Sequence, residues 1–195
     1  MEYVAVAARV LVGLVLLTSV AGKVRGRAAF RRFAATIPAF GLVPGRWTPV
    51  AAVATVTAEA VVPVLLAVPT TVVAGQALAA TLFAVLTLAV WRAVRARTGA
   101  VCRCFGAADT PLTRRHVVRN LILLAAAGAG LGAAVLGDGP TPLGGVLVAS
   151  TAGLVGALCV VRYEDLVDLF AHPPRPGTDH GASALGDRGT RRHRT

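Results

Sequence analysis

Long apolar runs alternate with short polar links over most of the chain. Five runs are each about long enough, at about 1.5 Å per helical residue, to cross a hydrocarbon core of about 30 Å. They cover Val4–Ala21, Val50–Val68, Val72–Trp91, Val117–Leu136 and Leu143–Val161. This pattern predicts an all-α protein, a polytopic bundle of five transmembrane helices.

The composition agrees with a lipid environment. Charged residues make up 15% of the 195 residues and hydrophobic residues 55%, whereas about a quarter of the residues of a soluble domain carry a charge. The segment that follows the last run is different, because it is polar and rich in Pro, Gly, Arg and His with little to bury. We expect residues 163–195 to form a basic, disordered tail.

The basic residues predict the orientation. The links after the first and third runs and the C-terminal tail are rich in Arg or Lys, and the links after the second and fourth runs have neither. Because basic loops stay on the cytoplasmic side, this places the N-terminus outside a plasma membrane and the C-terminus inside. The first run precedes its basic residues, which favours a retained helix over a signal peptide. The net charge is +11, but the basic residues lie in links between apolar blocks and the chain has few aromatic residues. No nucleic-acid partner is therefore expected.

The first basic link, Gly22–Thr48, allows two interpretations. It could be a short amphipathic helix in the membrane interface, with its basic residues toward anionic headgroups, or a plain basic loop. Pro38 and Pro44 would end such a helix. Its aromatic and aliphatic residues at helical spacing are Phe30, Phe33, Ile37 and Phe40, and its basic residues include Lys23, Arg25, Arg27, Arg31 and Arg32. Trp47 and Trp91 are expected at the interface on this side.

Two of the three cysteines, Cys102 and Cys104, form a C-x-C pair in the second basic link. Basic neighbours favour the thiolate form, and a disulfide across one residue is strained and labile, so a redox-active pair is the preferred interpretation. Inert thiols are an alternative. A metal site is not expected, because His116 is the one nearby third ligand for a zinc ion that takes four. For Cys159, which stands alone in the fifth run, packing is favoured over a role as resolving thiol.

Glu59 is the one acidic residue inside the five apolar runs. An unpaired carboxylate in lipid is costly, so Glu59 should face the bundle interior and be protonated or paired. It could relay protons, contact a quinone-like head group, or make an interhelical hydrogen bond to Gln76, Thr55 or Thr57. Arg9 is a candidate ionic partner.

The fourth run opens with His116 and Asn120, one helical turn apart and therefore on one face. Thr113 is a plausible N-cap. His116 could exchange a proton with a nearby thiolate, or these residues could simply anchor the helix end. Later in the same run, the alternating glycines Gly128, Gly130 and Gly132 should let a neighbouring backbone come close.

Several of these segments together resemble the MauE family, the methylamine utilisation membrane proteins, within the wider DoxX-like group. The resemblance rests on AGKVRGRAAF (Ala21–Phe30), the central Glu59, CRCFG (Cys102–Gly106) and RRHVVRNLILL (Arg114–Leu124). It covers roughly residues 4–137. It implies a four-helix core with functional thiols at Cys102 and Cys104, an intramembrane carboxylate at Glu59 and helix-start residues at His116 and Asn120. Arg103 departs from the family, which more usually has a small residue there.

The resemblance also implies a function. The family member that accompanies methylamine dehydrogenase is thought to help mature its disulfide-rich small subunit, and relatives look like partners of thioredoxin-like proteins. We therefore expect a MauE-like core over residues 1–137, a fifth helix over 138–162 and a role in thiol–disulfide maturation of an exported, disulfide-containing client. Cys102 and Cys104 would be the redox pair, and Glu59 and His116 would handle protons, with a quinone as a conceivable cofactor. A non-enzymatic assembly factor, or less favourably a small-solute or proton transporter, is the alternative.

Overall fold

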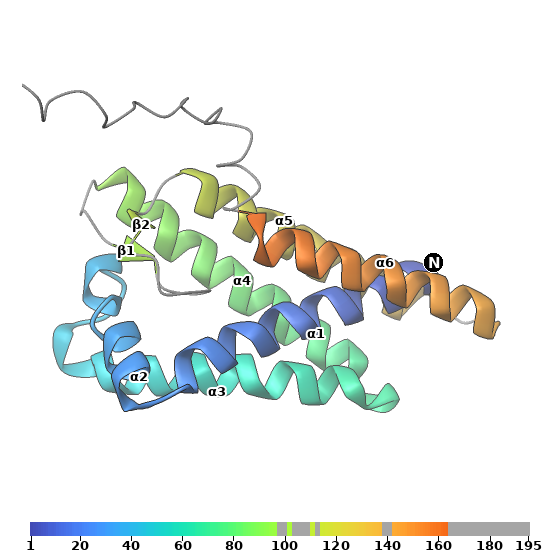
Figure 1. Cartoon of the computed structure of the whole chain (residues 1–195), viewed down its shortest axis with the longest axis horizontal. Coiled ribbons are helices and arrows are strands. Elements are labelled where there is room, and N and C mark those ends of the chain that lie inside the picture. Colours follow the sequence, from blue (N-terminus) through green and yellow to red (C-terminus); the bar gives the residue numbers. More distant parts are fainter. Residues whose placement is uncertain (97–100, 103–109, 112–113, 138–141, 164–195) are drawn as a thin grey trace, which may run out of the picture.

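The computed structural model describes residues 1–96, 101–102, 110–111, 114–137 and 142–163 (Figure 1). The helices are α1 (Glu2–Val24), α2 (Arg27–Ala34), α3 (Thr48–Ala67), α4 (Val72–Arg95), α5 (Arg114–Leu136) and α6 (Leu143–Val161), with short 3-10 turns η1 (Ile37–Phe40), η2 (Gly45–Trp47) and η3 (Pro69–Thr71). Two-residue strands β1 (Val101–Cys102) and β2 (Thr110–Pro111) lie between α4 and α5.

The predicted all-α class is confirmed. Five helical segments in the described residues are long and apolar enough to cross a membrane, and they correspond to the five apolar runs. Several extend past the apolar run into the polar links. For example, α1 ends at Val24, beyond Lys23, and α5 begins at Arg114. The extra turns carry cations, because Lys and Arg are good helix formers. Arg114 is exposed at its helix end, where its side chain can reach water.

Four long helices close into a ring. α1 packs on α3, α3 on α4, α4 on α5, and α5 returns to α1. α6 lies outside this ring against α1, so that α1 runs between α3 and α6 (Figure 1). The apolar side chains inside the ring form one core, which includes Val12, Leu16, Val62, Phe83 and Leu123. In lipid the other faces of the helices remain apolar, because the surrounding solvent is apolar too.

Small residues bring α6 close to α1. A side chain added at Gly153 would place its first carbon 2.5 Å from the backbone oxygen of Ala7, and one at Gly156 would meet Leu11 at 2.9 Å. Among the three glycines predicted to do this in α5, Gly130 alone has such neighbours, while Gly128 and Gly132 have nothing within 4 Å. The prediction was therefore wrong for Gly128 and Gly132, because their faces of α5 are not covered by another element.

The first basic link contains a helix, which decides between the two interpretations of that link. Phe33 and Ile37 are buried against Ala52 of α3, while Arg27 and Arg31 are exposed. The apolar face of α2 and η1 thus lies on protein rather than facing only lipid. The helix ends at Ala34, earlier than the predicted break at Pro38, which instead lies inside η1.

The second basic link contains a short antiparallel pairing. Val101 pairs with Pro111, and Cys102 pairs with Thr110. The backbone of Cys102 is therefore held close to that of a residue four positions before α5. Cys104 lies outside the described residues, as do Thr113 and the tail from residue 164.

Candidate functional site

A buried ion pair joins α1 to α3. The ammonium nitrogen of Lys23 lies 2.5 Å from each carboxylate oxygen of Glu59 and donates hydrogen bonds to both. Lys23 is 2% exposed and Glu59 1%. Because both charges are removed from solvent, their attraction is screened much less than at a surface.

Two further groups complete the surroundings of the ammonium. Lys23 donates to the hydroxyl of Ser19, one helical turn earlier on α1, at 2.9 Å, and that hydroxyl donates to Glu59 at 3.3 Å. The ring of Phe33 from α2 lies 4.7 Å from the ammonium, in the arrangement of a cation–π contact. Three helices therefore meet at one lysine, and we call Ser19, Lys23, Phe33 and Glu59 the buried lysine site.

This geometry corrects three predictions. Glu59 is paired, as expected, but with Lys23, a residue that was predicted to lie toward the lipid headgroups. Arg9 instead donates to the backbone oxygen of Ala67 at 2.7 Å, near the far end of α3. Thr55 donates to the backbone oxygen of Ala51 in its own helix at 2.8 Å.

Gln76, the other predicted partner of Glu59, forms a separate polar site. Its side chain is completely buried, and neither amide atom has a hydrogen-bond partner in the part of the chain that the structure describes. It faces Gly130 of α5 and Ala8 of α1. A side-chain carbon at Gly130 would lie 2.6 Å from the amide nitrogen of Gln76 and 2.7 Å from the β-carbon of Ala8. The glycine thus provides the space that the amide fills.

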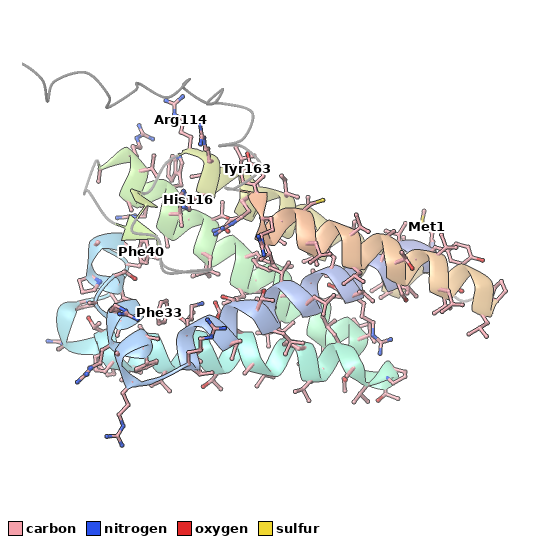
Figure 2. All side chains as sticks on the ribbon, viewed as in Figure 1. Met1, Phe33, Phe40, Arg114, His116 and Tyr163 are labelled. Atoms are coloured by element: carbon pink, nitrogen blue, oxygen red, sulfur yellow. The ribbon has the colours of Figure 1, made fainter. Side chains whose placement is uncertain are left out.

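The start of α5 is buried as well. His116 is 3% exposed, Arg119 3% and Asn120 7%, and this end of α5 packs on α4. Figure 2 shows His116 and Arg114 at the same end of the bundle as Phe33 and Phe40, with Met1 at the opposite end. The burial of Arg119 was not predicted. Its spacing of one turn before Leu123, a core residue, is the sequence signal that could have indicated it.

The structure describes the three cysteines to different extents. Strand β1 places the backbone of Cys102 at the α4–α5 end, whereas its side chain and the whole of Cys104 lie outside what the structure describes. Cys159 is exposed on α6, so the prediction that it packs inside the bundle was wrong. An exposed position in an apolar helix of this kind faces lipid, which is as apolar as a protein core and accepts a thiol equally well.

The signal that could have identified the buried lysine site was present in the sequence. Ser19 and Lys23 are four residues apart and therefore share one helix face, and a small hydroxyl followed by a cation one turn later is a local pair. Lys23 was nevertheless predicted to be a loop residue, because it follows the apolar run.

Comparison with known protein families places the ring of helices in a described family. The sequence profile of the family described as methylamine utilisation protein MauE matches residues 1–133. The matched part covers α1, α3 and α4 completely and α5 as far as residue 133, and it leaves α6 outside. No curated protein and no solved structure matches the chain.

Proposed function

Because the chain belongs to the MauE family, we propose that this multi-pass membrane protein carries out thiol–disulfide exchange in support of exported, disulfide-containing proteins, in an organism's use of amines such as methylamine. The redox pair would be Cys102 and Cys104. One observation supports this site above others: the β1–β2 pairing holds the backbone of Cys102 next to Thr110, between the end of α4 and the start of α5. A cysteine whose backbone is held by strand pairing can present its thiol to a partner protein.

The proposed reaction balances as an exchange. One thiolate of the reduced pair attacks a disulfide of a thioredoxin-like partner and forms a mixed disulfide, and the second thiol then closes the Cys102–Cys104 disulfide. Two electrons pass to the partner, which leaves with two thiols, and a second protein with a dithiol reduces the Cys102–Cys104 disulfide again by the same kind of exchange. The basic residues around the pair favour the attacking thiolate. We assign proton transfer to His116, because it lies at the start of the helix that follows the hairpin.

In this proposal Glu59 belongs to the scaffold more than to the chemistry. Both of its carboxylate oxygens accept hydrogen bonds from Lys23. A quinone head group or a transported proton that used Glu59 would first have to displace this ammonium. The ion pair therefore supports the redox interpretation over a transporter built around Glu59.

A second function, a non-enzymatic assembly factor, is favoured by a specific surface. An apolar groove of about 690 Å³ lies between α1, α5 and α6, and small residues such as Ala8, Ala129 and Gly145 line it. Small residues at such a surface allow close helix–helix contact in lipid. In this case the cysteines would be dispensable.

The experiment that separates the two functions measures thiol reactivity and client maturation together. The full chain would be labelled in intact cells with a membrane-impermeant maleimide, before and after reduction and after lysis. The variants would be Cys102→Ser/Cys104→Ser and, as the matched control, Cys159→Ser.

We expect labelling of the pair only after lysis and reduction, which fits a cycling pair with the N-terminus outside and the pair in the cytoplasm. The double variant should lose client maturation, and Cys159→Ser should keep it. Labelling in intact cells would reverse the orientation. Permanently reduced thiols, together with full maturation in the double variant, would reject the redox function and leave the assembly factor.

A further inference from the structure

A cavity of about 370 Å³ lies at the end of α4, apart from the buried lysine site. Its walls come from two elements: Ala39, Phe40 and Gly41 at the end of η1, and Trp91, Arg92 and Arg95 in the last turns of α4. This volume is within the range of small-molecule sites, about 300 to 1,000 Å³. Neither the proposed redox reaction nor the ion pair uses these residues.

The local backbone explains why the cavity forms. Gly41 has φ of 62°, the left-handed conformation that favours glycine, and its N–H donates to the backbone oxygen of Pro38. This turn ends η1 beside the last turns of α4. No other atom lies within 4 Å of a side chain added at Gly41, so the glycine is required by its conformation rather than by crowding. The side of α4 next to the turn remains open.

The basic and aromatic residues that line the cavity favour a ligand with an anionic group attached to an apolar part. Arg92 and Arg95 are exposed cations on the same turn of α4, and the guanidinium of Arg95 lies 5.3 Å from the centre of the Trp91 ring. Trp91 itself is 45% exposed, as expected of an indole at the level of lipid headgroups. Guanidinium groups bind phosphate oxygens through paired N–H donors. Phe40 and Ala39 offer an apolar surface on the opposite side.

The geometry points to this cavity as a binding site for the phosphate of an anionic phospholipid. Arg92 and Arg95 hold the phosphate, Trp91 and Phe40 flank the glycerol and the start of the acyl chains, and the chains continue along the apolar surface of α4. Basic pockets beside transmembrane helices are typical sites for such headgroups. Inorganic phosphate shares the anionic group but lacks the acyl chains that the aromatic walls contact. This site is independent of the thiol chemistry.

Trp91 provides the measurement, since the chain has two tryptophans. In the variant Trp47→Phe, Trp91 is the one remaining indole, and bromine on the acyl chains of a lipid beside it quenches its fluorescence. The full chain would be placed in nanodiscs of phosphatidylcholine with increasing fractions of brominated phosphatidylglycerol. Brominated phosphatidylcholine at the same fractions gives the quenching expected from random lipid contact.

We expect brominated phosphatidylglycerol to quench Trp91 at lower fractions than brominated phosphatidylcholine. Arg92→Gln/Arg95→Gln should raise the fraction required for half-maximal quenching about tenfold, because each basic residue at the surface contributes substantially to anionic lipid binding. The control Arg31→Gln/Arg32→Gln removes the same charge from exposed positions on α2 and should leave the fraction almost unchanged.

Three results would overturn the site. One is equal quenching by the two lipids. Another is an equal rise, in both double variants, of the phosphatidylglycerol fraction required for half-maximal quenching, which would indicate general attraction to a basic surface. The third is full reversal of the quenching by inorganic phosphate at constant ionic strength, which would assign the cavity to a free anion. Normal elution of each variant from size exclusion as a folded, monodisperse species keeps every comparison valid.

Discussion

Two of the buried polar sites in the bundle, those of Glu59 and Gln76, have opposite surroundings. Glu59 carries a charge and is surrounded by donors from another helix: the ammonium of Lys23 and the hydroxyl of Ser19. Gln76 is neutral and equally buried, yet its amide has no hydrogen-bond partner in the described part of the chain. The amide instead occupies space that is free because residue 130 is a glycine.

The difference follows from the free energy of desolvation. Removing an ion from water costs several kcal/mol even after relaxation, so a buried charge persists only beside an opposite charge. An unpaired amide costs less, about 1 to 3 kcal/mol by mutational data. We therefore infer that the buried lysine site stabilises the bundle as a unit, whereas Gln76 weakens it. The predictions below test that contrast.

Breaking the ion pair should have the largest effect. Glu59→Gln leaves the buried ammonium without its counter-charge and should lower the free energy of unfolding by about 3 to 5 kcal/mol. Lys23→Met should do the same, because it removes the ammonium that donates to both carboxylate oxygens. The measurement is unfolding of the purified protein in mixed detergent micelles with increasing sodium dodecyl sulfate.

The double variant Lys23→Met/Glu59→Met decides whether charge is the cause. Replacing both ions by apolar side chains of similar size should restore most of the loss, because no buried charge remains. Arg25→Met, an exposed cation two residues away, is the control and should change stability by less than about 0.5 kcal/mol. If the double variant is as unstable as the two single variants added together, the ion pair is not the source of the effect.

The same two sites show how far the sequence can be interpreted. The apolar runs predicted the five long helices, because hydropathy is a sum over about twenty residues and tolerates local errors. Burial of Glu59 also followed from its position. Its partner did not, because Lys23 follows an apolar run and looks like a loop cation until α1 is seen to continue to Val24.

The packing of α2 is a second feature that required the structure. Helical spacing of Phe30 and Phe33 showed an amphipathic segment, but the spacing is the same whether the apolar face meets lipid or α3. In the structure the apolar face of α2 packs on α3, and this packing places the ring of Phe33 over the ammonium of Lys23. For Cys104 the prediction stays a prediction, because it lies outside the described residues.

Filling the space beside Gln76 should have the second-largest effect. Gly130→Ala puts a carbon within 2.6 Å of the amide nitrogen and 2.7 Å of the β-carbon of Ala8. Overpacking of this kind costs about 1 to 3 kcal/mol. Gly128→Ala and Gly132→Ala are matched controls on the same helix with nothing within 4 Å, and removing a helical glycine there should be neutral or stabilising. Equal losses at all three positions would show that the glycines serve helix flexibility instead.

Replacing Gln76 by an apolar side chain of similar shape should change stability in the opposite direction from replacing Glu59. Gln76→Met removes the unpaired amide while keeping the volume, so the free energy of unfolding should rise by about 1 kcal/mol, measured in the same detergent titration. A loss of about 2 kcal/mol or more would contradict the contrast, because a volume-conserving replacement costs less than about 1.5 kcal/mol through packing and a larger loss would indicate a hydrogen-bonded amide. Full client maturation in this variant would further show that the amide has no part in function.

The contribution of Phe33 should be the smallest and should depend on the lysine. Phe33→Leu keeps a buried apolar group but removes the ring face that lies 4.7 Å from the ammonium. A cation–π contact contributes about 0.5 to 2 kcal/mol, depending on its exposure to solvent. Because the ammonium of Lys23 is already paired with Glu59, we expect the variant to lose about 1 kcal/mol more in the wild-type background than in Lys23→Met/Glu59→Met. The same cycle with Phe30→Leu, a partly buried ring on the same helix, should show no such dependence. If Phe33→Leu costs the same in both backgrounds, the ring stabilises α2 by packing on Ala52 alone, and the buried lysine site consists of α1 and α3 without α2.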